Sequence, residues 1–350
     1  MNIKDNIINL EDPLRAALDV LRGSSMGIVV FQDTNKKYAG VLRDQDIRDI
    51  LMRAPDLDTP CADYVIDAPI TIREDADTHD MLSVMQEHDS HYIVLICKNG
   101  QIADLKSRTD IEGRAPKPDM NVLLMAGGFG KRLYPLTNNT PKPMLRIGSK
   151  PMLEHIIRKI AAYGVDNFII STHYLPEKIT SYFGDGADLG VNIDYVHEDT
   201  PLGTGGALGL IKDKSKPLLM MNGDILTGLN VRAFYDFHIK NGNDISVAAR
   251  PYEFQVPYGV INVEDDGTVN DIVEKPVKKF LISGGVYILS PSVYQDIQEG
   301  EVFDLPDLVE ESIQNNKKVN TFLMWEYWLD IGKRAEYDLA QTFISHREAI

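Results

Sequence analysis

From residue 120 to the end of the chain, short apolar runs alternate with segments of helical length, and this alternation constrains the fold most. Runs such as NVLLM, NFIIST and LLMMN are apolar enough to be buried, and helix-like stretches such as LEHIIRKIAA lie between them. Strands that alternate with helices form a mostly parallel sheet with helices on both faces. Ligands of such sheets bind outside the carboxyl ends of the strands, so we expect functional residues directly after the apolar runs.

The first 115 residues carry a weak internal repeat with a period of about 64 residues. The helix-like LRAALDVLRGSSM precedes the strand GIVVF, a turn, the strand YAGVL and a helix that begins in RDQDIRDILM. The same order returns with a helix over Asp80–His88, the strand HYIVLI and a helix that begins in SRTDIEG. Because two such α/β units cannot each bury a sheet alone, we expect one pseudo-symmetric module over residues 1–115. Pro116 and Pro118 among charged residues predict a linker at 116–119, followed by a second domain over 120–350.

The segment GVLRDQDIRDIL and the order of elements around it resemble a pair of CBS domains. Such pairs often bind an adenine nucleotide through a Ser or Thr three residues before an Asp. Ser107 and Asp110 match this pattern in the second repeat, whereas Arg43 stands in place of the hydroxyl in the first. The resemblance implies either a regulatory nucleotide site at Ser107 and Asp110 or a purely structural or oligomerising module. It also implies a homodimer or a larger assembly.

A strand that runs directly into glycines gives the strongest chemical signal, in LLMAGGFGKRLYPLT. Glycines without side chains let backbone N–H groups approach an anion, and three cations follow them, as a triphosphate requires. The segment lacks the Gly-Lys-Ser/Thr ending of a P-loop. The phosphate-binding candidates are Ala126, Gly127, Gly128, Gly130, Lys131, Arg132 and Lys142.

Together with TPKPM, this segment resembles the signature of sugar-1-phosphate nucleotidyltransferases, over about residues 120–345. Members of that family transfer a nucleotidyl group from a nucleoside triphosphate to a sugar 1-phosphate and release pyrophosphate. The resemblance implies a Rossmann-like α/β domain with a mostly parallel sheet, placed after the CBS pair. It also implies that Arg132 and Lys142 steady the phosphates while the glycine loop holds the nucleotide.

A carboxylate follows the apolar run LLMMNGD, where Asp224 stands at the expected end of a strand. The position suits a metal ligand, and the alternative is a turn residue that caps the next segment. Two carboxylates far apart in sequence can share one Mg²⁺, whose other ligands are water and phosphate oxygens. In the family a matching pair binds Mg²⁺, so the resemblance implies this role for Asp224 and for Asp330 in EYWLDIG.

The sugar phosphate is expected to meet the segments VNDIVEKPV and SGGVYIL. Glu274 is an acceptor for sugar hydroxyls and Lys275 a cation for the phosphate, although an isolated Glu-Lys pair before a proline is usually only exposed. Tyr258, Gly259 and Gly285 resemble family positions where the backbone lies against the sugar.

A second glycine-rich segment, HEDTPLGTGGAL, reads the nucleobase in the family. Gly203 and Thr204 lie in a form of it that is more similar to guanylyl- and cytidylyltransferases than to thymidylyltransferases, which favours GTP. By contrast, the histidines, including His173 and His197, are expected to be ordinary packing or surface residues.

Charge and composition exclude other classes. The net charge is -16 and the sequence pI is about 4.9, so nucleic acids and anionic membranes are poor partners. The N-terminus has no secretory signal, no run approaches the ~18 apolar residues of a membrane span, and two cysteines fit a reducing compartment. We therefore expect a cytoplasmic protein.

The order of a CBS pair and a short nucleotidyltransferase is similar to the GTP:glucosamine-1-phosphate guanylyltransferases of bacterial legionaminic acid pathways. That similarity implies glucosamine 1-phosphate as acceptor and a sugar nucleotide for surface-glycan or nonulosonic acid synthesis. The alternatives are mannose or heptose 1-phosphate with GTP, and glucose 1-phosphate with CTP or UTP. A non-enzymatic alternative is an inactive nucleotide sensor, which the presence of all the expected catalytic residues disfavours. Those residues are Arg132, Lys142, Asp224 and Lys275, with Asp330 as the second metal ligand.

Overall fold

The computed structural model describes residues 3–24, 27–53, 56–65, 70–88, 90–112 and 117–348. It divides into two compact units between Lys117 and Pro118. The linker predicted at 116–119 spans this division, although Pro116 itself lies outside the described residues. Cys61 and Cys97 are both free thiols in the first unit. In the described ranges, no helix has the length and apolar character needed to cross a membrane.

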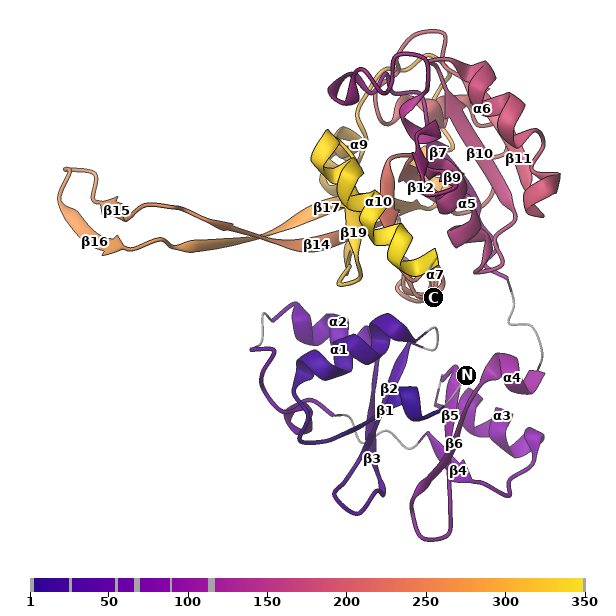
Figure 1. Ribbon diagram of the computed structural model, residues 1–350, viewed down its shortest axis with the longest axis vertical. Helices are drawn as coiled ribbons and strands as arrows, with labels where there is room; N and C mark the ends of the chain where they lie inside the picture. The colour runs from indigo at the N-terminus through magenta and orange to yellow at the C-terminus, as the bar shows by residue number, and fades with distance from the viewer. Residues whose placement is uncertain are drawn as a thin grey trace. The chain divides into compact units, whose positions relative to one another are not determined.

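The first unit contains two copies of one α/β pattern (Figure 1). The first copy consists of β1 (Ile7–Asn9), α1 (Leu14–Gly23), β2 (Ile28–Gln32), β3 (Tyr38–Arg43) and α2 (Asp44–Leu51). The second copy consists of β4 (Thr71–Arg73), α3 (Thr78–Glu87), β5 (Tyr92–Ile96), β6 (Ile102–Ser107) and α4 (Arg108–Glu112). Each of these elements in the second copy begins 64 residues after its counterpart, which confirms the predicted period.

The two copies bury their sheets against each other. Within the described residues each copy forms a three-stranded sheet, in the order β1-β2-β3 and β4-β5-β6, with one parallel and one antiparallel pair. Helix α1 buries apolar side chains at helical spacing, at Leu14, Ala17, Leu18 and Leu21. A shared core joins the two sheets through Ile28, Val30, Val41, Ile70, Val94 and Leu105.

A mostly parallel sheet organises the second unit (Figure 1). In the described part of the chain it has seven strands, in the order β11-β10-β7-β12-β17-β14-β18. Strand β17 runs antiparallel to both of its neighbours, and the other neighbouring pairs are parallel. The strands are β7 (Asn121–Met125), β10 (Asn167–Thr172), β11 (Asn192–His197), β12 (Leu218–Asn222), β14 (Ile245–Gln255), β17 (Val277–Leu289) and β18 (Val319–Leu323).

Helices cover both faces of this sheet, because alternate strand residues enter two different cores. Val122 and Leu124 of β7 belong to one core, whereas Leu123 belongs to the other. The helices are α5 (Met152–Ala161), α6 (Pro176–Phe183), α7 (Val231–Lys240), α8 (Pro291–Tyr294), α9 (Leu305–Gln314) and α10 (Arg334–Glu348). Short strands complete the unit as β8 (Arg146–Ile147), β9 (Lys150–Pro151), β13 (Ile225–Thr227), β15 (Val260–Val263), β16 (Val269–Val273) and β19 (Trp328–Asp330).

Strands β14 and β17 continue beyond the sheet as a two-stranded ribbon that ends in the hairpin β15–β16 (Figure 1). We call residues 251–281 the arm. The ribbon begins at a β-bulge, where Gly284 and Gly285 are inserted between the Ala248–Val286 and Ala249–Ser283 pairs. The arm is described throughout, and nearly every one of its residues is exposed.

Candidate active site

The carboxyl ends of parallel strands β7, β10 and β12 meet at one edge of the sheet. Backbone hydrogen bonds hold the segments that leave this edge together. Ala126 N donates to Ser171 O at 3.0 Å, and Gly223 N donates to Met125 O at 2.9 Å. A side chain at Gly223 would place its Cβ 2.6 Å from Met125 O, so this close approach requires glycine. The edge therefore brings the glycine loop and the segment around Asp224 side by side.

A buried ion pair lies at this edge. The 3-10 helix Lys142–Met144 places Lys142 where its residue is only 8% exposed. The Lys142 ammonium pairs with Asp224 Oδ2, across 82 positions of sequence. A buried charge needs such a partner, because its desolvation is otherwise uncompensated. Lys142 and Asp224 are thus fixed relative to each other before any ligand binds.

Asp330 joins Asp224 through backbone pairing. Strand β19 pairs antiparallel with β13 so that Asp330 lies opposite Ile225, and Ile331 N donates to Asp224 O at 3.0 Å. Asp330 is exposed as a residue, but partial burial of its carboxyl raises the pKa, and the nearby Asp224 carboxylate raises it further. The charges of Lys142 and Arg132 act in the opposite direction on this pKa.

Arg132 is the fourth charged member of the group. It lies in the 3-10 helix Lys131–Leu133 that follows the glycine loop. A Cβ on Gly332 would lie 3.6 Å from Arg132 Nη1 and 3.7 Å from Asp330 Oδ1, so both side chains border the same glycine. We call Arg132, Lys142, Asp224 and Asp330 the charged cluster. Two cations and two carboxylates from four separate segments meet there.

The charged cluster fits a hard divalent cation. Among the described residues, no group of three or more His, Cys, Asp or Glu side chains is arranged to hold a metal ion. Mg²⁺ usually takes one or two carboxylates and fills its other positions with water and phosphate oxygens. Burial, and then repulsion from Asp224, raise the pKa of Asp330, and a cation placed between the two carboxylates would offset that repulsion.

The glycine loop over residues 127–130 is open on one side and tightly constrained on the other. No described atom lies within 4 Å of the position that a Gly128 Cβ would take. Gly130 has φ +61°, and a Cβ there would lie 2.9 Å from Thr137 Cγ2 and 3.0 Å from Lys142 Cβ. Thr137 Oγ1 also donates to Gly130 O at 3.0 Å. Lys131 follows with its ammonium 5.5 Å from the centre of the Phe129 ring.

The second glycine-rich segment is held by packing against residues 298–304. Cβ atoms on Gly203 and Gly206 would lie 2.4 Å from Phe303 O and Glu301 O, respectively. Thr204 Oγ1 donates to Asp304 Oδ1 at 3.0 Å and accepts from Leu305 N at 2.9 Å. The hydroxyl of Thr204 thus helps to cap α9. Base recognition by Gly203 and Thr204 stays a prediction.

The structure separates the residues predicted for the sugar phosphate. Gly285 lies in the body of the unit, where its Cβ would meet Ile225 Cδ1 at 2.4 Å and Asn222 Nδ2 at 2.9 Å. Tyr258, Gly259, Glu274 and Lys275 instead lie together on the arm, next to the hairpin β15–β16. Binding of the sugar phosphate by these five residues stays a prediction. The sequence pattern did not indicate where the ribbon leaves the sheet, so this separation was not predicted.

Several residues next to the glycine loop were missed by sequence reasoning. Glu198 is 5% exposed, accepts from Ser171 Oγ at 2.6 Å and from Leu202 N at 3.2 Å, and borders Gly127. His173 contacts the edge of the exposed Phe129 ring, with centroids 5.2 Å apart, and stacks on His197 at 6.5 Å. The position of Glu198 directly after β11 was an available signal.

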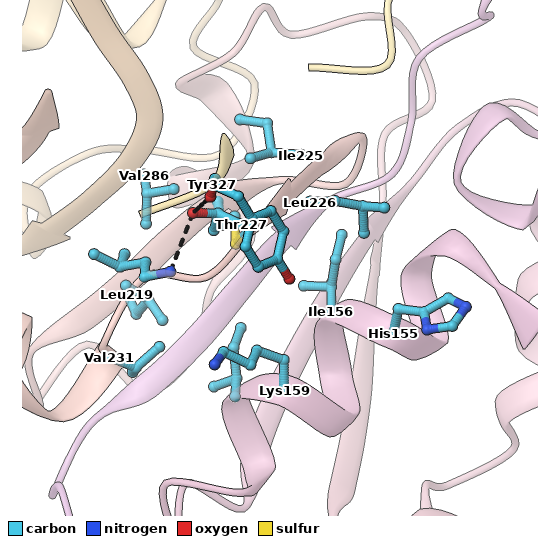
Figure 2. A pocket seen from close by; sticks show the side chains of 13 residues that line it. His155, Ile156, Lys159, Leu219, Ile225, Leu226, Thr227, Val231, Val286 and Tyr327 are labelled. Carbon is cyan, nitrogen blue, oxygen red and sulfur yellow. Dashed lines mark hydrogen bonds between the residues drawn. The ribbon is translucent and has the colours of Figure 1, made fainter. Parts of the chain in front are cut away.

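A separate cavity lies inside the core of the second unit (Figure 2). Its volume is about 100 Å³, well below the ~300–1,000 Å³ of ligand pockets. Thr227 Oγ1 donates to Tyr327 O at 3.0 Å, and His155 Nε2 lies 2.9 Å from Ile147 O, so these lining groups have partners. No residue predicted for the active site lines this cavity.

In the first unit, Ser107 and Asp110 bond to each other. Ser107 N and Oγ both donate to Asp110 Oδ2 at 2.7 Å, and these bonds lower the pKa of Asp110. The pair caps the start of α4, as Arg43 and Asp46 do for α2 in the first copy. An adenine nucleotide at Ser107 and Asp110 stays a prediction.

Comparison with curated proteins gives similar sequences that match only part of each chain. A mannose-1-phosphate guanyltransferase of Debaryomyces hansenii is 36% identical over 235 residues, which cover 62% of this chain and 62% of the relative. A mannose-1-phosphate guanyltransferase of Schizosaccharomyces pombe is 33% identical over 233 residues, with the same two coverages. The chain therefore spans about 62% of the length of these relatives.

Among solved structures, HddC from Yersinia pseudotuberculosis complexed with GMP-PN is similar, with a TM-score of 0.50 and 27% sequence identity. The match covers 64% of this chain and 99% of HddC. Residues 3–53, the first copy in the first unit, match the CBS domain family. Residues 121–347 match the family described as nucleotidyl transferase, and the chain belongs to that nucleotidyl transferase family.

Proposed function

We propose that this protein transfers a nucleotidyl group from a nucleoside triphosphate to a sugar 1-phosphate and releases pyrophosphate. The observation that carries the proposal is the charged cluster beside the glycine loop. Lys142 pairs with Asp224, Asp330 adjoins Asp224, and Arg132 borders Asp330, all next to a loop that follows a parallel strand. This set offers a triphosphate both positive charge and carboxylates for a metal.

The reaction needs no general base, because the sugar phosphate oxygen is already an anion at neutral pH. That oxygen forms a bond to the α-phosphorus in line with the bond that breaks. The electron pair of the broken P–O bond leaves with pyrophosphate. Bringing two polyanions together is the main difficulty, so catalysis rests on positioning and charge stabilisation.

The residues of the charged cluster have separate tasks in this scheme. Arg132 offsets the charge that develops on the leaving pyrophosphate, and the Gly127–Gly130 backbone holds its phosphates. Lys142 orients Asp224, its ion-pair partner, and adds positive charge next to the phosphates. Asp224 and Asp330 would hold Mg²⁺, which supplies positive charge to the bound phosphate oxygens. Lys275 orients the incoming sugar phosphate.

Two observations favour GTP as the nucleotide. The LGTGGA segment is more similar to that of guanylyl- and cytidylyltransferases than to that of thymidylyltransferases, and the two curated relatives described above are named as guanyltransferases. Their names make mannose 1-phosphate the first sugar to test. Glucosamine 1-phosphate stays a prediction from domain order, as does a role in surface-glycan synthesis. Heptose 1-phosphate with GTP, and glucose 1-phosphate with CTP or UTP, remain alternatives.

Pyrophosphate release in the presence of Mg²⁺ tests this proposal directly. The assay combines GTP, CTP, UTP and dTTP with the 1-phosphates of mannose, glucosamine, heptose and glucose. We expect strong turnover with GTP and one sugar, and omission of Mg²⁺ should abolish it. A folded protein that binds nucleotide but releases no pyrophosphate from any pair would overturn the proposal and favour a nucleotide sensor.

Asp224→Asn tests the role of the charged cluster. We expect turnover to fall by about 10²–10³-fold, the size of effect seen when one electrostatic group is lost from an active site. Because this change also weakens the ion pair with buried Lys142, circular dichroism should verify folding, and Asp330→Asn provides a second variant. Asp188→Asn, at an exposed site in the 3-10 helix Ala187–Leu189, is the matched control. Full activity in both site variants would contradict the assignment.

A further inference from the structure

The charged cluster and the predicted sugar-phosphate cation are far apart within one chain. Asn222 and Ile225 lie close to Asp224 in the sequence. Their side chains lie next to Gly285, where the ribbon leaves the sheet. From Ser283 to Val277 the ribbon is continuously paired, and six residues of strand span roughly 20 Å at ~3.3 Å per residue. Lys275 lies beyond Val277. In this conformation its ammonium does not reach a phosphate bound at Asp224 of the same chain.

The arm nevertheless holds its polar residues in a defined arrangement. Lys275 N donates to Tyr258 O at 3.3 Å, and Gln255 Nε2 donates to Lys275 O at 3.4 Å. A Cβ on Gly259 would lie 3.1 Å from Glu274 Oε2, so the glycine leaves room for that carboxylate. Lys275 has φ +46°, which non-glycine residues rarely adopt. Its side chain is 59% exposed and that of Glu274 72%, so both point where another molecule can meet them.

The arm exposes a large apolar surface, which indicates that it binds a partner. A two-stranded ribbon is marginally stable in water by itself. The arm nevertheless exposes eleven large apolar side chains, each between 39% and 74% accessible. They are Tyr252, Phe254, Tyr258, Ile261, Val263, Val269, Ile272, Val273, Val277, Phe280 and Leu281. Contiguous apolar patches larger than a few hundred Å² mark interaction sites.

Two observations together indicate that the partner is a second copy of this chain. They are the distance of Lys275 from the charged cluster of its own chain and the exposed apolar side chains of the arm. The rest of the second unit, which we call the body, carries the charged cluster, and the arm carries Lys275, the lysine predicted for the sugar phosphate, away from the body of its own chain. In a two-fold dimer the same exchange happens twice, so both arms are covered and both sites are completed. Eleven half-exposed apolar side chains offer area of the order of the ~800 Å² that each partner buries in a standard interface.

We propose that the arm of one copy docks on the body of a second copy and delivers Glu274 and Lys275 to the partner's charged cluster. Glu274 then accepts hydrogen bonds from the sugar and Lys275 pairs with its phosphate, while the nucleotide is held by the other chain. The proposal rests on the proposed function, because it assigns the sugar phosphate to this shared site. Neither chain forms the complete site alone.

Mixing two inactive variants tests the sharing of sites. Asp224→Asn and Lys275→Ala are purified with different affinity tags, mixed in equal amounts and allowed to exchange subunits. A heterodimer that shares sites has one body with Asp224 facing one arm with Lys275. Random exchange makes half of the dimers heterodimers with one intact site of two, so about one quarter of wild-type turnover is expected. If each site uses its own arm, every site in the mixture is defective.

The outcomes distinguish failure of the two proposals. Recovery of turnover in the mixture supports shared sites. The wild-type protein can turn over nucleotide while the mixture, captured through both tags, stays inactive. This result overturns the sharing of sites and leaves the proposed function intact. A wild-type protein that sediments as a monomer at assay concentration overturns it as well. Wild-type protein that releases no pyrophosphate overturns the proposed function.

A cross-link tests the docking without any activity. One tagged chain carries Lys275→Cys and the other carries Asn222→Cys, and mild oxidation follows mixing. We expect a disulfide-linked pair of different chains on a denaturing gel. Lys275→Cys mixed with Asp188→Cys is the matched control, and the natural Cys61 and Cys97 are common to both mixtures. Equal cross-linking in the two mixtures, or none in either, overturns the docking of the arm at the partner's site.

Discussion

The two glycine-rich segments of the second unit look alike in sequence, but their glycines face different surroundings. In the loop over residues 127–130, Gly128 borders open space. In the segment over residues 203–209, added Cβ atoms would all lie within 2.5 Å of other atoms, among them Phe303 O and Glu301 O. Open space leaves backbone N–H groups accessible to an anion, whereas close contact means that the glycines serve packing.

This difference shows that glycine richness predicts a close approach of the backbone but not what approaches it. At Gly128 a ligand is the candidate for the group that approaches the backbone. At Gly206 that group is another part of the same chain, Glu301. The distinction also applies to the neighbouring hydroxyl. Thr204 was predicted to bind the nucleotide, which stays a prediction, and its Oγ1 is bonded to Asp304 and to Leu305 N at the start of α9.

The largest expected effect on this comparison comes from adding one methyl group to each segment. Gly206→Ala should lower the free energy of unfolding by about 1–3 kcal/mol, because its Cβ would overlap Glu301 O and Leu202 Cβ. Gly128→Ala should change it by less than ~0.5 kcal/mol, yet lower turnover about tenfold, the equivalent of ~1.4 kcal/mol in the barrier. Urea unfolding and pyrophosphate release measure the two quantities. Equal stability losses in both variants would remove the distinction.

A smaller effect is expected from the hydroxyl that joins the second segment to α9. Thr204→Val keeps the shape of the side chain but loses the bonds to Asp304 Oδ1 and Leu305 N. We expect a loss of about 1 kcal/mol in the free energy of unfolding, typical of a hydrogen bond at a helix start. Thr204→Ser retains the hydroxyl and is the control. A stable Thr204→Val variant with weakened GTP binding would instead support the predicted contact with the base.

The smallest effect concerns the pH dependence of the same contact. Backbone and side-chain hydrogen bonds from Thr204 hold the pKa of Asp304 below its ordinary value of 3.8. A lowered pKa in the folded state means that the stabilisation is present above 3.8 and is lost as the pH falls through the folded pKa. Asp304→Asn should therefore lower the thermal midpoint slightly at pH 6, and the difference from wild type should shrink as the pH falls below 3.8. A difference that does not shrink with falling pH would point to a cause other than this ionisation.

Much of the architecture was predictable because it depends on local periodicity. The 64-residue repeat and the alternation of apolar runs with helices indicated both units correctly. The antiparallel direction of β17 was not predictable, since SGGVYIL has the same apolar pattern in either direction. The arm was not predicted, for a related reason. Its apolar residues are typical of buried strands, and only the structure shows that β14 and β17 extend beyond the neighbouring strands of the sheet.

The charged cluster was predictable in its members but not in its contacts. Asp224 and Lys142 were identified separately by strand position and by resemblance, and no local pattern indicates that they form an ion pair. The bond from Thr204 to Asp304 was not predicted for the same reason, because the two residues lie 100 positions apart. Tertiary pairing of this kind depends on the whole sheet, which local sequence patterns do not determine.

The pairing of β13 with β19 also sets the order in which the site becomes complete during synthesis. As the polypeptide leaves the ribosome from its N-terminus, the glycine loop, Lys142 and Asp224 emerge long before Asp330. Until β19 arrives and aligns with β13, Ile331 N cannot bond to Asp224 O and the second carboxylate is missing. A nascent chain therefore presents the glycine loop, Lys142 and Asp224 first, and the charged cluster forms only after β19 has been translated.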